Sequence, residues 1–427
     1  MKSITKKLTE KKVVKDFFAV TSTNIILQPI QVVKGFVVAN FLGPADYGLL
    51  KSIELIQMLN KFGNLGFKTV AQREVANARS KGDTKKEVSI RNTNFTAEFL
   101  LAVLLFIAGG ISAIFIESIA LASLVFLAST GLLVRKIQGI FLCETSIQKQ
   151  FVLQSRNTLY SGILTASLVI ATVPWLKIYA ILITNVAVGL FGIYHLRKNL
   201  KFDFNFGINK KELKKSFKIG VPFALATLAF ASYKYSERIL VISYIDEEAL
   251  GYFSFGMMVV GNFTILFKAA IKVRMQDIWE MVGAGKHLKV HKMVIKETLL
   301  LTSASIVLIP ILWYAVELLV PLYLSKWTGG IKVAQYLTLS MPFMVIANYA
   351  HSVTNSTLVN KIKYPIYMRL ISTGILFLGT LLLYKNGLLT IENYVLVNIA
   401  GYAFYNLSLL VAYKYYFINK YIRTQNV

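Results

Sequence analysis

The sequence has little acidic charge and a single cysteine. Of its 427 residues, 21 are Asp or Glu, against 47 Lys or Arg, and charged residues make up 16% of the chain. Soluble globular chains carry about 25% charged residues. Cys143 has no second cysteine with which to form an intrachain disulfide or a cysteine-based metal cluster. The motifs of P-loop ATPases, HExxH zinc proteases and GxSxG hydrolases are also missing, so the sequence predicts no enzyme of these classes, no cofactor and no metal.

Apolar residues dominate instead. They make up 55% of the chain, and the mean hydropathy is +0.57. Apolar runs of roughly 20 residues, long enough to cross a bilayer as helices, recur throughout. We therefore predict an all-α polytopic membrane protein with about 12 transmembrane helices, at roughly 17–41, 48–67, 94–116, 119–141, 157–175, 177–196, 218–243, 250–271, 297–320, 333–358, 364–384 and 392–415.

The basic residues follow these spans in a sided pattern. If the N-terminus is cytoplasmic, most Lys and Arg fall in cytoplasmic segments such as 68–91, 135–156 and 197–218. The opposite side holds only Lys177, Lys326, Lys332 and Lys385. This bias predicts a multi-pass protein of the lipid bilayer with both termini cytoplasmic. Because the basic residues are spread between spans and not gathered on one soluble face, they argue against nucleic-acid binding.

A weak internal repeat relates the two halves of the chain. LGPADYGLL at 42–50 aligns with IDEEALGYF at 245–253, a shift of 203 residues, so that Gly48 falls on Gly251. Both stretches belong to the helical hairpin that opens a half. Repeats of this kind predict two lobes with substrate bound between them. We assign an N-lobe with spans 1–6 to residues 1–200, a cytoplasmic joining loop to 201–216, and a C-lobe with spans 7–12 to residues 217–427.

Polar stripes run along several of the spans. At 100° per residue, Glu54, Gln57, Lys61 and Asn64 share one face of the second span. A stripe of this kind is costly against acyl chains, so it indicates a watery cavity or a partner helix. The first span carries Asn24, Gln28, Gln31 and Lys34, the seventh carries Lys234, Glu237 and Arg238, and the eighth carries Lys268 with Lys272 just beyond it.

Cations outnumber carboxylates in these stripes, which predicts a cavity that attracts phosphate oxygens. The candidate diphosphate-binding residues are Lys34, Lys61, Lys234, Arg238, Lys268 and Lys272; Glu54 and Glu237 are candidate coupling or cavity carboxylates; Asn24, Gln28, Gln31, Gln57 and Asn64 are candidate lining residues. A structural alternative stays open for part of this set. Lys61, Lys68, Lys272 and Arg369 lie near cytoplasmic helix ends, where long side chains can reach the membrane interface.

Two stretches resemble a known family. NFLGPADYGLL followed by a basic loop with AQREVA, and KKSFKIGVPFALATLAFASYKYSERILVISYIDEEALGYFSF in the second half, resemble the polysaccharide exporters of the multidrug/oligosaccharidyl-lipid/polysaccharide (MOP) superfamily, especially Wzx-type O-antigen flippases. The resemblance implies two six-helix lobes around a central cationic cavity. It implies a transporter that moves undecaprenyl-diphosphate-linked oligosaccharide from the cytoplasmic to the periplasmic leaflet of a bacterial inner membrane by alternating access. Other polysaccharide-assembly membrane proteins are conceivable partners.

Two other functions remain open at this point. A drug or cation antiporter of the same superfamily would need an acidic cavity, which the excess of cations opposes. A membrane glycosyltransferase or ligase acting on the same lipid carrier would need a catalytic carboxylate or a large periplasmic loop. Neither is evident in the sequence.

Overall fold

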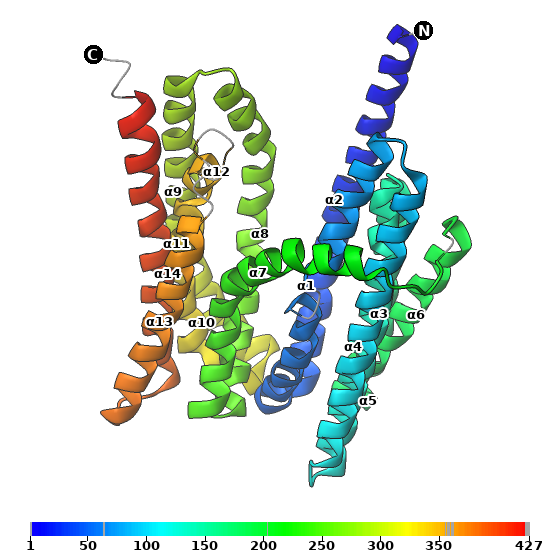
Figure 1. Ribbon diagram of the computed structural model, residues 1–427. Coiled ribbons are helices and arrows are strands. Elements are labelled where there is room, and N and C mark those ends of the chain that lie inside the picture. Colours follow the sequence, from blue (N-terminus) through cyan, green and yellow to red (C-terminus); the bar gives the residue numbers. More distant parts are fainter. Residues whose placement is uncertain are drawn as a thin grey trace. The chain divides into compact units, whose positions relative to one another are not determined.

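The computed structural model describes residues 2–422 except 63–64, 203, 355, 357–358 and 360–362; side chains 2–21, 24–25, 57–62, 80, 266, 268–270, 272–273, 276 and 279 are also outside the description. Every regular element in the described part is a helix (Figure 1). The elements are α1 Lys2–Phe62, α2 Phe67–Ser80, α3 Thr84–Ile114, α4 Ile119–Ile147, α5 Phe151–Leu176, α6 Ile178–Asn199, α7 Lys210–Tyr244, α8 Glu247–Gly283, α9 His287–Tyr323, the 3-10 helix η1 Ser325–Gly330, α10 Ile331–Thr338, α11 Met341–Ile346, α12 Asn348–Thr354, α13 Lys363–Lys385, α14 Ile391–Tyr413 and the π-helix η2 Lys414–Ile422.

Ten helical stretches in the described residues are long and apolar enough to cross a membrane. One of them lies within α1, which is broken at Gly43, where φ is 73° and ψ is 174°. The two arms of α1 therefore match the first two predicted spans, and α8 matches the eighth. The prediction of an all-α membrane protein with about 12 spans is confirmed. The tenth predicted span is not one continuous helix, because it is divided into the short helices α10, α11 and α12.

The helices form two units. Unit 1 comprises residues 1–42 and 53–228, and unit 2 comprises residues 43–52 and 229–427. The kinked segment of α1 thus packs with unit 2, and α7 contributes residues to both units. The lobe boundaries expected from the sequence, at 200 and 217, stay a prediction.

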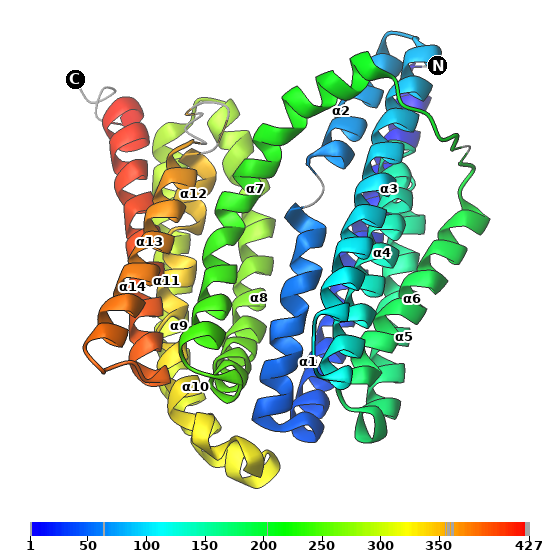
Figure 2. The same ribbon diagram turned by 60° about the horizontal axis from the view of Figure 1, so that its bottom comes forward.

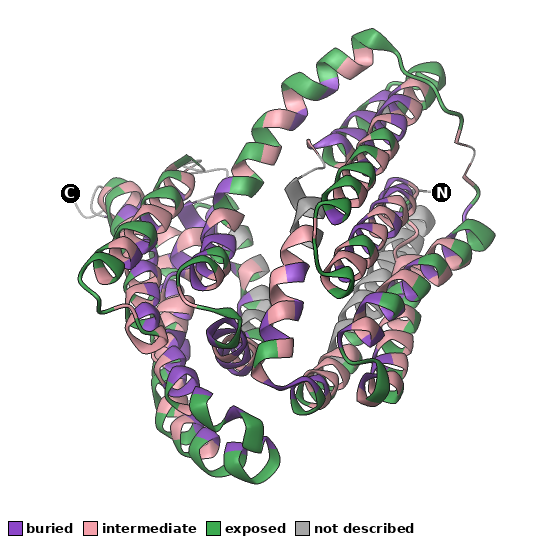
Figure 3. Cartoon of the chain, turned by 90° about the horizontal axis from the view of Figure 1, so that it is seen from below, coloured by how far each residue is buried: buried purple, intermediate pink, exposed green. Residues whose placement is uncertain are grey.

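Unit 1 is a bundle in which α3 packs against α2 and α4, while α6 packs against α4 and α5 (Figure 2). Its buried residues lie on the helix faces that point at one another (Figure 3). The outer faces of these long helices are apolar and exposed, as expected for helices in a bilayer. Leu104 and Ile107 of α3 illustrate this, with 61% and 52% exposure.

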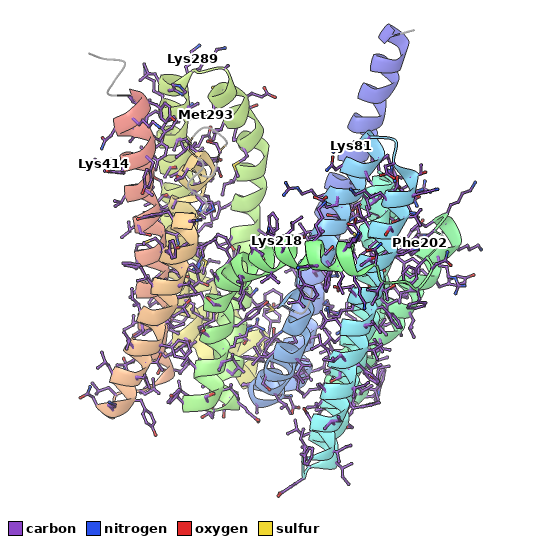
Figure 4. The ribbon with its side chains drawn as sticks, viewed as in Figure 1. Lys81, Phe202, Lys218, Lys289, Met293 and Lys414 are labelled. Carbon is purple, nitrogen blue, oxygen red and sulfur yellow. The ribbon has the colours of Figure 1, made fainter. Side chains whose placement is uncertain are left out.

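Three phenylalanines after α6 pack against α3 within unit 1. Phe202, labelled in Figure 4, packs edge-on against Phe95 with ring centroids 5.7 Å apart. Phe206 packs in the same way on Phe99, at 5.2 Å, and Phe204 lies between them, 4.7 Å from Phe206. These ring contacts hold the three phenylalanines against α3.

Unit 2 is built from helices α8–α14, the end of α7, and residues 43–52. α9 packs against α11, and α13 against α14 (Figures 1 and 2). Trp327 of η1 is fully buried, with Phe255 at 4.7 Å and Tyr47 at 5.4 Å between ring centroids. Burial of large aromatic surfaces is a major stabilising term. Tyr47 therefore anchors the α1 segment in the core of unit 2.

Two glycines allow this segment to come close to α8. A Cβ on Gly48 would lie 1.7 Å from the carbonyl oxygen of Glu247, and a Cβ on Gly251 would lie 2.0 Å from that of Pro44. The shift of 203 residues relates Gly48 to Gly251 and Pro44 to Glu247, so each contact is the counterpart of the other. A reciprocal contact of this kind is expected around a two-fold axis. It supports the weak repeat found in the sequence.

We predict that Gly48→Ala destabilises the protein, because its methyl group would meet backbone and force the two segments apart. Overpacking of this kind costs about 1–3 kcal/mol. The matched control is Gly374→Ala, in the middle of α13, where a Cβ would meet no atom within 4 Å. An alanine there should be neutral or stabilising by up to about 1 kcal/mol. Thermal unfolding of the purified variants tests this, and equal melting temperatures for both would contradict the close approach.

Candidate functional site

Unit 2 encloses a cavity of about 530 Å³. Its walls come from α7, α8, α11–α14 and the α1 segment. Four cations line it, namely Lys51, Lys234, Arg238 and Arg369. Lys234 and Arg238 lie one turn apart on α7, so the helical repeat directs both to the same side. Lys51 reaches the cavity because residues 43–52 pack with this unit, and its Nζ lies 4.9 Å from the centre of the Tyr47 ring.

A single carboxylate, Glu237, stands among the described lining residues. The residue is only 1% exposed, and its Oε2 accepts hydrogen bonds from Asn398 Nδ2 and the Tyr402 hydroxyl, each at 3.2 Å. Lys234 and Arg238 attract it electrostatically. A buried carboxylate is costly unless it is paired and hydrogen-bonded, and this one has both kinds of partner. Glu237 is therefore held in a fixed position at the cavity wall.

Arg369 of α13 is oriented by aromatic rings. Its guanidinium carbon lies 3.6 Å from the centre of the Tyr405 ring and 5.3 Å from that of Tyr233. Stacking of this kind holds the planar group while leaving its N–H edges directed outward. The Nε atom is buried and has no hydrogen-bond partner among the described residues. Arg369 thus carries a donor for which a ligand in the cavity could supply the acceptor.

The cavity as a whole is suited to an oxyanion. Four cations face one carboxylate, and Asn348 and Asn406 add neutral hydrogen-bonding groups. Ligand cavities commonly measure about 300–1,000 Å³. Arg and Lys bind phosphate and carboxylate oxygens through charge-assisted hydrogen bonds. The sign and size of the cavity therefore fit a small anionic group, such as a phosphate-bearing headgroup.

The structure brings together three residues predicted from the sequence, Lys234, Glu237 and Arg238, in this cavity. Four others, Lys34, Glu54, Gln28 and Gln31, lie half-buried in unit 1. The side chains of Lys61, Lys268, Lys272, Asn24, Gln57 and Asn64 are outside the described part of the chain. The binding roles assigned to all of these residues stay predictions.

Several lining residues were missed or misjudged in the sequence. Arg369 is near the start of an apolar span, a position that favours a side chain reaching the membrane interface, yet it lines the cavity. The tyrosines at 402 and 405 carry no charge to mark them, and their role depends on how α14 packs against α7 and α13. A lone arginine within an otherwise apolar span is the one signal that could have identified this wall.

A sequence model of the polysaccharide biosynthesis protein family matches residues 13–273, more than half of the chain. The comparison with curated proteins gives no match. Among solved structures, the lipid II flippase MurJ in an inward closed conformation has 13% identity and a TM-score of 0.69, over 92% of this chain and 87% of that one.

Two further structures share the fold. An inward-facing multidrug resistance MATE family transporter of the MOP superfamily has 10% identity and a TM-score of 0.65, over 93% of this chain and 99% of that one. A MOP superfamily transporter from Pyrococcus furiosus, described as having a binding pocket of reverse polarity, has 12% identity and a TM-score of 0.58, over 94% of each chain. At these identities the similarity establishes the MOP transporter fold.

We predict that Asn398→Ala destabilises unit 2, because Glu237 loses a buried hydrogen-bond donor. Loss of a partner to a buried polar group costs about 1–3 kcal/mol. Asn386→Ala is the control: its amide donates to the Leu382 carbonyl at the exposed end of α13. Thermal unfolding should show a lower melting temperature for N398A only. An unchanged melting temperature in N398A would show that the carboxylate does not depend on this contact.

Proposed function

Because the chain belongs to the polysaccharide biosynthesis protein family, we propose that it is a flippase for a lipid-linked oligosaccharide. In this proposal the substrate is carried on undecaprenyl diphosphate and moves from the cytoplasmic to the periplasmic leaflet of a bacterial inner membrane. Both termini are then cytoplasmic, and transport proceeds by alternating access. The fold shared with a lipid II flippase supports a lipid-linked substrate.

The observation that carries the proposal is the cationic cavity of unit 2. A diphosphate brings negative charge into a membrane protein, where an unpaired charge is costly. Lys234, Arg238 and Arg369 can share that charge through hydrogen bonds to its oxygens. Neutral sugars and the isoprenoid chain carry no charge, whereas the diphosphate is anionic in every substrate of this class. We therefore assign this cavity to the diphosphate.

Glu237 has a separate part in the proposal. It lies beside Lys234 and Arg238, so it reduces the net positive charge that a bound diphosphate experiences. A transport site must bind its ligand well enough to admit it and weakly enough to release it. We propose that Glu237, held by Asn398 and Tyr402, keeps the affinity for the diphosphate in the range that permits release.

The two other functions fit the cavity less well. A drug or cation antiporter would bring a positive ligand to a cavity with four cations and one described carboxylate. Repulsion between like charges opposes that ligand. A glycosyltransferase or ligase would need a carboxylate free to exchange a proton. Glu237 is instead buried, accepts two hydrogen bonds and lies beside two cations, an arrangement that fixes it in the cavity wall.

We predict that Arg238→Gln slows flipping of a fluorescently labelled polyprenyl-diphosphate oligosaccharide in proteoliposomes by tenfold or more. The substitution removes the charge and shortens the side chain, and it leaves a polar amide in its place. A hydrogen bond to a charged group contributes about 1.5–3 kcal/mol, and about 1.4 kcal/mol corresponds to a tenfold change. Accessibility of the label to a membrane-impermeant quencher measures the rate.

The matched control is Lys289→Gln, an exposed cation in the first turn of α9 (Figure 4). It removes the same charge from the same unit, at a place away from the cavity. We expect K289Q to flip the substrate at the rate of the unaltered protein. Equal rates for R238Q and K289Q would refute the role of the cavity, and no flipping by the unaltered protein would refute the proposed substrate.

A further inference from the structure

Unit 1 has a cavity of its own, of about 390 Å³. It is lined from α2, α4, α5 and α6, and its polar side chains are Lys68, Arg135, Gln138, Ser161, Thr165 and Asn185. Lys68 was assigned from the sequence to a cytoplasmic helix end, and Arg135 to a segment expected to be cytoplasmic. Four neutral hydrogen-bonding side chains thus accompany two cations in its wall.

Its positive charge is maintained by a buried ion-pair group. Lys136 and Glu98 are both fully buried, and Lys136 Nζ lies 3.0 Å from Glu98 Oε1. Lys68 Nζ approaches the same oxygen at 3.3 Å from the cavity side, with 19% of its side chain exposed. One carboxylate therefore serves two cations. Since Lys136 already compensates Glu98, the charge of Lys68 remains available to a ligand.

Arg135 supplies the second cation of the wall. Its Nη2 donates to Asn185 Oδ1 at 2.8 Å, the one hydrogen bond it makes among the described residues. Glu54 attracts it electrostatically. A guanidinium has five N–H donors in a planar arrangement that matches an oxyanion. Asn185 therefore fixes the plane of the group, and donors are left over for a ligand.

The neutral side chains offer donors and acceptors together. The hydroxyl of Ser161 is buried and has no hydrogen-bond partner among the described residues. Two glycines give the longer side chains their room: a Cβ on Gly139 would lie 2.6 Å from Lys68 Nζ, and a Cβ on Gly192 would lie 2.1 Å from Gln138 Nε2. Hydroxyl groups both donate and accept hydrogen bonds, so this mixture suits a polyhydroxylated ligand.

We propose that the cavity of unit 1 is a second subsite, which binds an acidic sugar of the oligosaccharide. Lys68 and Arg135 hold the oxyanion of the sugar, a carboxylate or a phosphate. Gln138, Ser161, Thr165 and Asn185 bind its hydroxyl groups. The inference rests on the proposed function, because it takes the sugar to be part of the transported molecule. It adds the class of the substrate, an oligosaccharide whose repeat carries negative charge.

Calorimetric titration of the purified full-length protein tests the proposal. The probes are glucuronate, glucose 6-phosphate, glucose and inorganic phosphate. We expect glucuronate or glucose 6-phosphate to bind at least tenfold more tightly than glucose and than inorganic phosphate. Whichever acidic sugar binds more tightly shows whether the site prefers a carboxylate or a phosphate. Equal binding of glucose would refute the role of the cations, and equal or tighter binding of inorganic phosphate that Arg135→Gln weakens would refute the sugar site.

Three variants locate the binding. Arg135→Gln should weaken binding of the acidic sugar tenfold or more. Lys68→Gln should do the same and is expected to fold, because Glu98 keeps Lys136 as its partner. Arg156→Gln, an exposed position on α5 of the same unit, is the matched control and should bind as the unaltered protein does. Unchanged affinity in folded R135Q and K68Q would overturn the proposal.

The two cavities can be told apart in the same titrations. Arg238→Gln in unit 2 should weaken binding of inorganic pyrophosphate and leave binding of the acidic sugar unchanged. R135Q should weaken binding of the acidic sugar and leave binding of inorganic pyrophosphate unchanged. Loss of sugar binding with intact pyrophosphate binding would therefore assign the sugar to the cavity of unit 1. Loss of flipping in R238Q with intact sugar binding would show that this variant affects the diphosphate site alone.

Discussion

A charge inside a bundle of membrane helices must be given partners, and this requirement governs both units. Glu98 is neutralised by Lys136, and a second cation, Lys68, shares the same oxygen. Glu237 accepts hydrogen bonds from Asn398 and Tyr402 and lies between cations. In both groups the carboxylate has cationic partners, and cations are in excess. The surplus positive charge faces a cavity, because water or an anionic ligand there can compensate it.

The packing of a short segment of α1 decides which residues take part in the cavity of unit 2. Gly48 and Gly251 lack the side chains that would separate α1 from α8, and Tyr47 packs on the buried Trp327. Lys51 follows one turn after Tyr47 and so reaches the cavity. Gly48 and its counterpart Gly251 are thus required for this close packing. Lys51, a charged residue of that segment, contributes positive charge to the cavity wall.

The sequence was sufficient for the features that depend on composition and periodicity. Apolar runs located the spans, and the charged turn of α7 at Lys234, Glu237 and Arg238 stood out against its surroundings. Features that depend on tertiary packing were not accessible. Lys136 looked like a cytoplasmic charge until its pairing with Glu98 was seen, and Tyr405 became relevant only because it stacks on Arg369. Uncharged residues of a cavity wall cannot be separated from ordinary helix contacts by sequence alone.

The most direct test is to compare the binding of inorganic pyrophosphate and of tetraphenylphosphonium, a lipophilic cation, to the purified protein. The cationic cavity predicts saturable binding of pyrophosphate that weakens as the salt concentration rises, because salt screens charges. It also predicts weaker pyrophosphate binding in Arg369→Gln, whose stacked guanidinium is lost, and no saturable binding of the cation. Saturable binding of tetraphenylphosphonium without binding of pyrophosphate would contradict the account.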